Sequence, residues 1–135
     1  MDYRTDNQEL TAVDFLQLAQ RVWPGQYDLE LTTTALTRTI NVTAWDDGRL
    51  VGCVRILTDG HFFSTVTEVL VDLACRRQGI GRHLMELAWG VSPTSLQFGV
   101  QPGSEGFFEK IGFEPALMSY GKRKPRPVPQ DAENV

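Results

Sequence analysis

Apolar positions recur at two different spacings along the chain, which predicts a fold that mixes helices and strands. The apolar-rich stretch after Thr11 predicts a first helix that ends near Arg21, because Thr11 is a candidate N-cap with Asp14 at capping-box distance. A second helical stretch covers residues 28–37, although its three consecutive threonines are weak helix formers. Two helices are therefore expected to precede the first strands.

Alternating apolar and polar residues predict the middle of the chain to be a sheet. Residues 40–44 and 50–57 flank Asp46-Asp47-Gly48, which has the residue types of a tight turn, so they predict a β-hairpin. Residues 64–71 are rich in β-branched side chains and predict a third long strand.

Helical spacing returns in the second half of the chain. Apolar residues at this spacing predict a helix from about Gln78 to Gly90, followed by a strand at 95–100 and a short helix at 105–111. Residues 113–120 are expected to form a last strand pair or an irregular equivalent. The expected order is therefore two helices, three strands and then alternating helices and strands.

Length and composition favour one domain. The chain has 135 residues, of which 41% are hydrophobic and 22% charged, as in ordinary globular proteins. No apolar run approaches the roughly 20 residues that span a bilayer, and the first residues lack the features of a signal peptide. Two cysteines outside any CxxC pair suit a reducing compartment. We therefore expect a cytoplasmic protein with no membrane partner.

Positive charge is concentrated in two places, although the net charge is −4. Arg76, Arg77 and Arg82 lie within one short segment, and four further basic residues lie in the proline-rich stretch 122–135. That stretch is predicted to be a flexible tail after a single domain at 1–121. A nucleic-acid anchor is the weaker alternative for the tail, because the acidic balance argues against a dedicated nucleic-acid binder.

The segment that carries chemistry runs from the third strand into the next helix. Gly79 and Gly81 allow the backbone to approach a ligand closely, and the free N–H groups of the helix start favour an anion. Three arginines add full positive charge, so a pyrophosphate suits this turn. The spacing fits neither a dinucleotide fingerprint, since Leu84 replaces its third glycine, nor a P-loop.

Two motifs resemble those of one family. Arg76-Arg77-Gln78-Gly79-Ile80-Gly81 resembles the Q/R-x-x-G-x-G/A signature of the GCN5-related N-acetyltransferase (GNAT) superfamily. The segment 107–113, Phe-Phe-Glu-Lys-Ile-Gly-Phe, resembles that family's F-Y-E-K-x-G-F motif. The resemblance covers about residues 3–121. It implies an α+β fold with a mixed, mostly antiparallel central sheet that is splayed at the acetyl-CoA site and flanked by about four helices.

The resemblance implies acetyl-CoA (coenzyme A) as the cosubstrate, and no metal. Strand backbone would hold the pantetheine arm, the arginine- and glycine-containing turn would hold the pyrophosphate, and two later residues would complete the cofactor site. These expected cofactor-binding residues are Leu70, Val71, Arg76, Arg77, Gln78, Gly79, Ile80, Gly81, Arg82, Gln101 and Phe108.

The same resemblance suggests the catalytic groups. Glu68, at the start of the third strand, is the expected base. Phe108 stands where the family often has a proton-donating tyrosine, so Tyr120 is the candidate acid, with water or the ammonium formed on the attacking amine as alternatives. Trp23 and Tyr27 are expected to line the acceptor pocket, although core packing is an alternative for Trp23.

These features together predict an N-acetyltransferase. It would transfer an acetyl group from acetyl-CoA to a primary amine of a small molecule or peptide by direct attack in a ternary complex. A non-catalytic acyl-CoA-binding or sensing module with the same fold is the alternative. Apart from the arginine turn the body is acidic, which favours a cationic amine as acceptor. Nucleic acid is not an expected partner, and a homodimer would be in keeping with the family.

Overall fold

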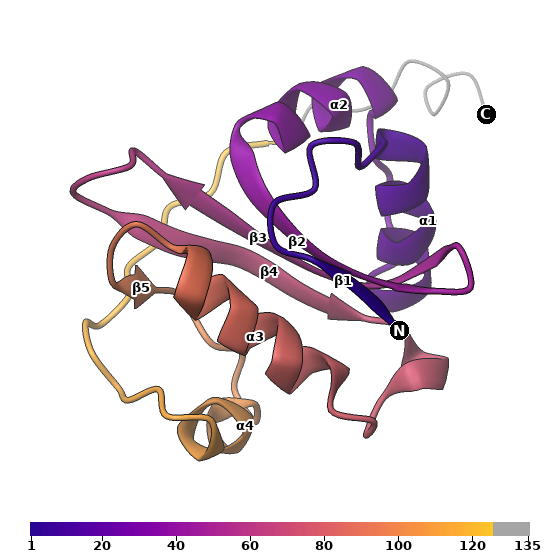
Figure 1. The fold of residues 1–135 in the computed structure, drawn as a ribbon. Helices are drawn as coiled ribbons and strands as arrows, with labels where there is room; N and C mark the ends of the chain where they lie inside the picture. Colours follow the sequence, from indigo (N-terminus) through magenta and orange to yellow (C-terminus); the bar gives the residue numbers. More distant parts are fainter. Residues whose placement is uncertain (126–135) are drawn as a thin grey trace.

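The computed structural model describes residues 1–125 and builds them around one five-stranded sheet with the order β1-β2-β3-β4-β5 (Figure 1). The strands are β1 (Asp2–Arg4), β2 (Thr39–Asp46), β3 (Arg49–Thr58), β4 (Ser64–Val71) and β5 (Leu96–Gln97). The helices are α1 (Ala12–Val22), α2 (Leu29–Thr37), the single 3₁₀ turn η1 (Leu73–Cys75), α3 (Ile80–Val91) and α4 (Glu105–Lys110).

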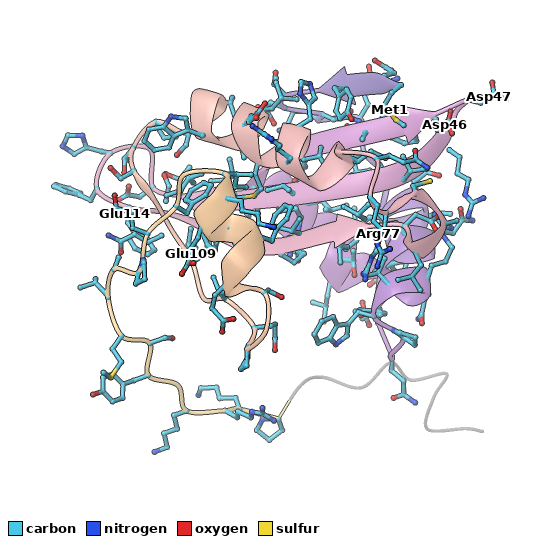
Figure 2. All side chains as sticks on the ribbon, turned by 90° about the horizontal axis from the view of Figure 1, so that it is seen from below. Met1, Asp46, Asp47, Arg77, Glu109 and Glu114 are labelled. Atoms are coloured by element: carbon cyan, nitrogen blue, oxygen red, sulfur yellow. The ribbon has the colours of Figure 1, made fainter. Side chains whose placement is uncertain are left out.

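The sheet is mixed and mostly antiparallel, as predicted. Strands β1 to β4 pair antiparallel in sequence, and β5 joins β4 in parallel. The first strand was not predicted; it pairs Asp2 with Trp45, so Met1 lies beside the turn at Asp46 and Asp47 (Figure 2).

Helices cover both faces of the sheet (Figure 1). On one face α1 and α2 enclose a core that includes Phe15, Leu18 and Leu70. On the other face α3 packs Leu84 and Met85 against a second core, which the aromatic residues around α4 extend. Because β4 contributes to both cores, its position is fixed from both sides.

Local signals in the sequence correctly predicted most of these elements. The Thr11 hydroxyl accepts a hydrogen bond from the Asp14 N–H at 3.1 Å, which confirms the N-cap of α1. Asp28 caps α2 in the same way, through the Leu31 N–H at 2.8 Å. The β2–β3 hairpin forms around the predicted turn, where Asp47 and Gly48 both have positive φ.

The C-terminal part of the sheet is shorter than predicted. A strand at 95–100 was expected, but β5 contains only Leu96 and Gln97. Residues 113–120 form the irregular alternative and no strand. Pro115 lacks a backbone donor and a two-residue β5 offers a partner strand little to pair with, which explains the irregular path.

The predicted tail, 122–135, falls mostly outside the described residues, so it stays a prediction. Residues 122–125 form no helix or strand. None of the helices within 1–125 has the length and apolar character that crossing a membrane requires.

Gly52 of β3 allows α3 to lie close to the sheet. A Cβ atom at this position would lie 2.8 Å from Leu84 Cδ1 and 3.0 Å from Ile80 Cγ2, so these buried side chains or α3 itself would have to shift. We expect Gly52→Ala to lower the free energy of unfolding by about 1–3 kcal/mol, as overpacked cores do. Gly90 of α3 has open space around it, so Gly90→Ala is the control and should stabilise by about 0.5–1 kcal/mol. Urea unfolding of both variants would measure this difference, and an unaffected Gly52→Ala protein would contradict the tight contact.

Asp72 ties the end of β4 to its surroundings. Its buried carboxylate accepts hydrogen bonds from Arg21 Nε at 2.8 Å, Arg49 Nη2 at 3.1 Å and the Ala74 N–H at 3.1 Å. Burial works to raise the pKa of Asp72, but these hydrogen bonds and charges outweigh it and hold the pKa below its ordinary value. The network fixes the chain just before the arginine-rich turn.

We expect Asp72→Asn to lower the free energy of unfolding by about 2–3 kcal/mol at pH 7, because a hydrogen-bonded buried charge is lost. A lowered folded-state pKa means that the carboxylate stabilises the fold above its unfolded pKa of about 3.9. That contribution is lost as the pH falls through the lower folded value, so the gap between wild type and variant should narrow in acid. Urea unfolding at pH 7 and pH 3 tests this, with the exposed Asp2→Asn as control; an equal gap at both pH values would contradict it.

Candidate active site

The sheet opens between β4 and β5. Their pairing stops after Ser64–Leu96 and Thr65–Gln97, and the chain beyond Gln97 leaves β4. A cavity of about 730 Å³ extends from this opening and is lined by β4 on one side and by 98–101 on the other. The backbone of β4 beyond Thr65 therefore faces a cavity where a neighbouring strand would otherwise pair.

This one cavity brings together seven of the residues singled out from the sequence. They are Trp23, Tyr27, Glu68, Leu70, Arg76, Gln101 and Phe108. They come from the α1–α2 loop, β4, the turn before α3 and the segment around α4, so the fold assembles one site from distant parts of the chain.

The turn into α3 has the geometry of an anion site. Gly79 precedes the helix with φ of 79°, and no side chain of the described residues caps the first turn. The first intrahelical bond runs from the His83 N–H to the Gly79 carbonyl at 3.0 Å, so the N–H groups before His83 have no helical acceptor. They are available to a phosphate.

Positive charge surrounds these N–H groups. Arg76, Arg77 and Arg82 are exposed, and Arg77 has φ of 66°, an uncommon conformation outside glycine. Figure 2 shows Arg77 on the loop that leads into α3, far from Glu109 and Glu114. Arg82 Nε contacts Glu86 Oε1 at 3.1 Å on the exposed helix surface. Glu86 therefore offsets part of the charge of Arg82, whereas residues 76–79 contain two arginines and no acidic residue.

Glu68 does not stand alone in the cavity. Arg55 on β3 donates from Nη2 to Oε1 at 2.6 Å and from Nε to Oε2 at 2.7 Å, a bidentate pair across the strands. The strand register shifts here: Arg55 faces Glu68 and Ile56 faces Val66, which leaves Thr67 as the extra residue of a β-bulge. The Thr67 hydroxyl also donates to Glu68 Oε2.

The ion pair faces the α1 side of the sheet. The Arg55 guanidinium lies 5.3 Å from the centre of the Phe15 ring. Burial works to lower the pKa of Arg55, but the hydrogen bonds and charge of Glu68 hold it above its ordinary value. Burial also raises the pKa of the neighbouring Cys53 thiol, which is fully enclosed and therefore unreactive. Arg55 keeps the Glu68 carboxylate oriented.

Phe108 belongs to an aromatic group at the other side of the cavity. Its ring centre lies 5.0 Å from Phe98 and 5.0 Å from Phe107, and Phe113 packs against Phe98 at 5.2 Å. A Cβ atom on Gly81 would lie 3.4 Å from the Phe107 ring, so this group also contacts the start of α3. It forms an apolar wall with no proton donor.

Trp23 and Tyr27 lie at the opposite side, in the loop between α1 and α2. The Tyr27 hydroxyl donates to the Trp23 carbonyl at 2.6 Å, which holds the loop together. Trp23 is 60% exposed, so core packing is not its role.

The structure does not bring Tyr120 to this site. It is 90% exposed and does not line the cavity that contains Glu68. Seven expected cofactor-binding residues also lie outside the cavity lining, although all but the first belong to the turn into α3 or to its first helical turn: Val71, Arg77, Gln78, Gly79, Ile80, Gly81 and Arg82.

Sequence reasoning missed Arg55 and Phe15 as site residues. The signal for Arg55 was a single charged residue between Val54 and Ile56 in an otherwise apolar strand. Its partner became visible only with the strand register.

Comparison with known families agrees with this geometry. The model of the acetyltransferase (GNAT) domain matches residues 38–115, which is more than half of the chain. The chain belongs to the GNAT family. Members of this family use acetyl-CoA.

Solved structures share this GNAT fold along almost the whole chain. A GNAT-family acetyltransferase from Streptococcus pneumoniae TIGR4 is 25% identical, with a TM-score of 0.72, covering 91% of this chain and 97% of that one. A probable acetyltransferase from meticillin-resistant Staphylococcus aureus is 20% identical, with a TM-score of 0.75 and coverage of 93% and 98%.

The aminoglycoside N-acetyltransferase AAC(6′)-Iy, solved in complex with CoA, is 16% identical, with a TM-score of 0.71 and coverage of 91% and 93%. No curated protein matches the sequence. The comparisons confirm the predicted family and its α+β fold.

Proposed function

We propose that this GNAT domain is an N-acetyltransferase that transfers the acetyl group of acetyl-CoA to a primary amine in a ternary complex. The observation that carries the proposal is the shared cavity: Glu68 lies in the same cavity as the open edge of β4, and Arg76 links that cavity to the turn into α3. The acetyl-CoA and amine sites would therefore adjoin.

The residues present fit acetyl-CoA. The unpartnered N–H groups at the start of α3 and the arginines Arg76, Arg77 and Arg82 would hold the pyrophosphate. The β4 backbone beyond Thr65 would hold the pantetheine arm opposite Gln101, and the Phe108 ring would cover it. Acetyl-CoA supplies the acetyl group as a thioester.

The transfer requires one proton to leave the amine and one to reach the thiolate. The amine nitrogen forms a C–N bond to the carbonyl carbon and the C–S bond breaks, so CoA leaves as a thiolate. Glu68, oriented by Arg55, would accept the proton of the amine directly or through water. Because Phe108 has no hydroxyl and Tyr120 lies outside the cavity, we propose that the thiolate is protonated by water or by the positively charged nitrogen of the tetrahedral adduct; in the second case Glu68 takes its proton from the substrate ammonium before the attack.

A non-catalytic acyl-CoA-binding module is the second candidate, and Phe108 in an entirely apolar aromatic group favours it. One assay separates the two functions. An enzyme releases free CoA thiol in proportion to acetylated amine when both acetyl-CoA and an amine are present. A binding module binds CoA saturably, and its thiol release is unchanged by any amine in a broad panel.

A further inference from the structure

The acceptor end of the cavity has an unusual charge balance for an amine site. We define this end as the lining contributed by α1, the α1–α2 loop and α2, together with Arg55 and Glu68. Arg55 and Glu68 are the charged residues among this lining, and they neutralise each other through two hydrogen bonds. The acceptor end therefore offers one carboxylate that is already paired.

Positive charge lies next to this end. Trp23 and Tyr27 also line a neighbouring cavity of about 640 Å³, whose lining includes Arg123 and Lys124 from the end of the described chain. No acidic residue belongs to that described lining. The nearest acid in sequence, Asp28, accepts a hydrogen bond from the Leu31 N–H at the start of α2 and lines neither of the two cavities. An acceptor that approaches along the Trp23–Tyr27 loop meets two cations.

Apart from Thr32, the remaining lining of this end is aromatic and aliphatic. Phe15, Trp23, Tyr27 and Phe98 contribute rings to the cavity. An ammonium group can bind over such a ring, but the Arg55 guanidinium already lies over Phe15 at 5.3 Å. Each additional ammonium of a polycation would lose water without gaining a free carboxylate, which is unfavourable.

We propose that the acceptor is a monoamine with an aromatic or aliphatic body and that polycationic amines are excluded. This inference rests on the proposed function and names its acceptor class. The overall acidity of the chain favours cationic acceptors in general. The two cavities beside Trp23 and Tyr27 have linings that are neutral to positive, so the inference from them is narrower.

Binding in the presence of saturating CoA tests the inference independently of catalysis. Isothermal titration calorimetry would compare 2-phenylethylamine, spermidine and kanamycin at one pH and ionic strength. We expect 2-phenylethylamine to bind at least about tenfold more tightly than either polycation. Equal or tighter binding of spermidine or kanamycin, or no binding of 2-phenylethylamine, would overturn the inference.

Variants locate the selectivity. Trp23→Ala should weaken 2-phenylethylamine binding severalfold, whereas Trp89→Ala should leave it unchanged, since Trp89 on α3 is similarly exposed, at 58%, but lies outside the cavity. The double variant Arg123→Ser/Lys124→Ser should bind spermidine more tightly than wild type. Thr32→Asp, which adds a carboxylate to the acceptor end, should do the same. If the ratio of spermidine affinity to 2-phenylethylamine affinity is unchanged in both variants, the charge argument is wrong.

The two proposals can fail separately. Selective 2-phenylethylamine binding without acetyl transfer would support the ligand preference of the cavity and overturn the catalytic function. Acetylation of polycations in preference to monoamines would support the catalytic function and overturn the acceptor class.

Discussion

Replacing Glu68 with glutamine is expected to lower turnover by about 10²- to 10⁴-fold, the usual contribution of a positioned general base. The amide of glutamine has nearly the shape of the carboxylate but cannot accept the proton of the amine. CoA affinity should stay within about twofold of wild type, because the turn into α3 is untouched. Steady-state thiol release and CoA titration would measure the two effects.

Two further variants make this result interpretable. Glu30→Gln removes an exposed carboxylate from the first turn of α2 and should retain wild-type turnover. Since glutamine leaves the mostly buried Arg55 without its full partner, the double variant Arg55→Met/Glu68→Met replaces the ion pair as a unit, which is often tolerated. It should be folded and inactive. Wild-type turnover in Glu68→Gln would contradict the assignment of the base.

Replacing Gly79 with valine is expected to weaken CoA binding by at least about tenfold. Gly79 has φ of 79°, where a side chain costs about 1–2 kcal/mol and a β-branched one more, so the turn must change shape. That change moves the N–H groups that would bind the pyrophosphate. Calorimetric titration with CoA would measure the affinity.

Gly60 provides a matched control. It has φ of 85° in the β3–β4 connection, and a Cβ atom added at either glycine would meet no other heavy atom within 4 Å. Gly60→Val should therefore carry similar backbone strain and bind CoA as wild type does. Equal CoA affinities of the two variants would show that the turn into α3 is not the pyrophosphate site.

Elements defined by local signals were predictable from the sequence. The Thr11 cap, the turn at Asp47 and Gly48 and the helical spacing of α3 each depend on residues close together in the chain. Strand β1 was not predictable, because three residues acquire strand geometry only through pairing with β2 about forty residues later. The shortness of β5 likewise depends on where the chain leaves β4.

The features of the candidate site also separate into those that depend on neighbouring residues and those that depend on tertiary structure. The turn from Arg76 to Gly81 is contiguous, so its chemistry could be inferred from residue order. The pairing of Arg55 with Glu68 depends on the strand register and on the bulge at Thr67, neither of which the sequence reveals. The exclusion of Tyr120 depends on the irregular path of 113–120.

A crystal structure with bound acetyl-CoA would test the central proposal most directly. We expect the pyrophosphate to lie within hydrogen-bonding distance of the N–H groups at the start of α3. We also expect the pantetheine arm to lie between β4 and residues 98–101, with the thioester in the cavity that contains Glu68. A pyrophosphate bound elsewhere, or an arm that leaves the thioester outside this cavity, would contradict the proposal.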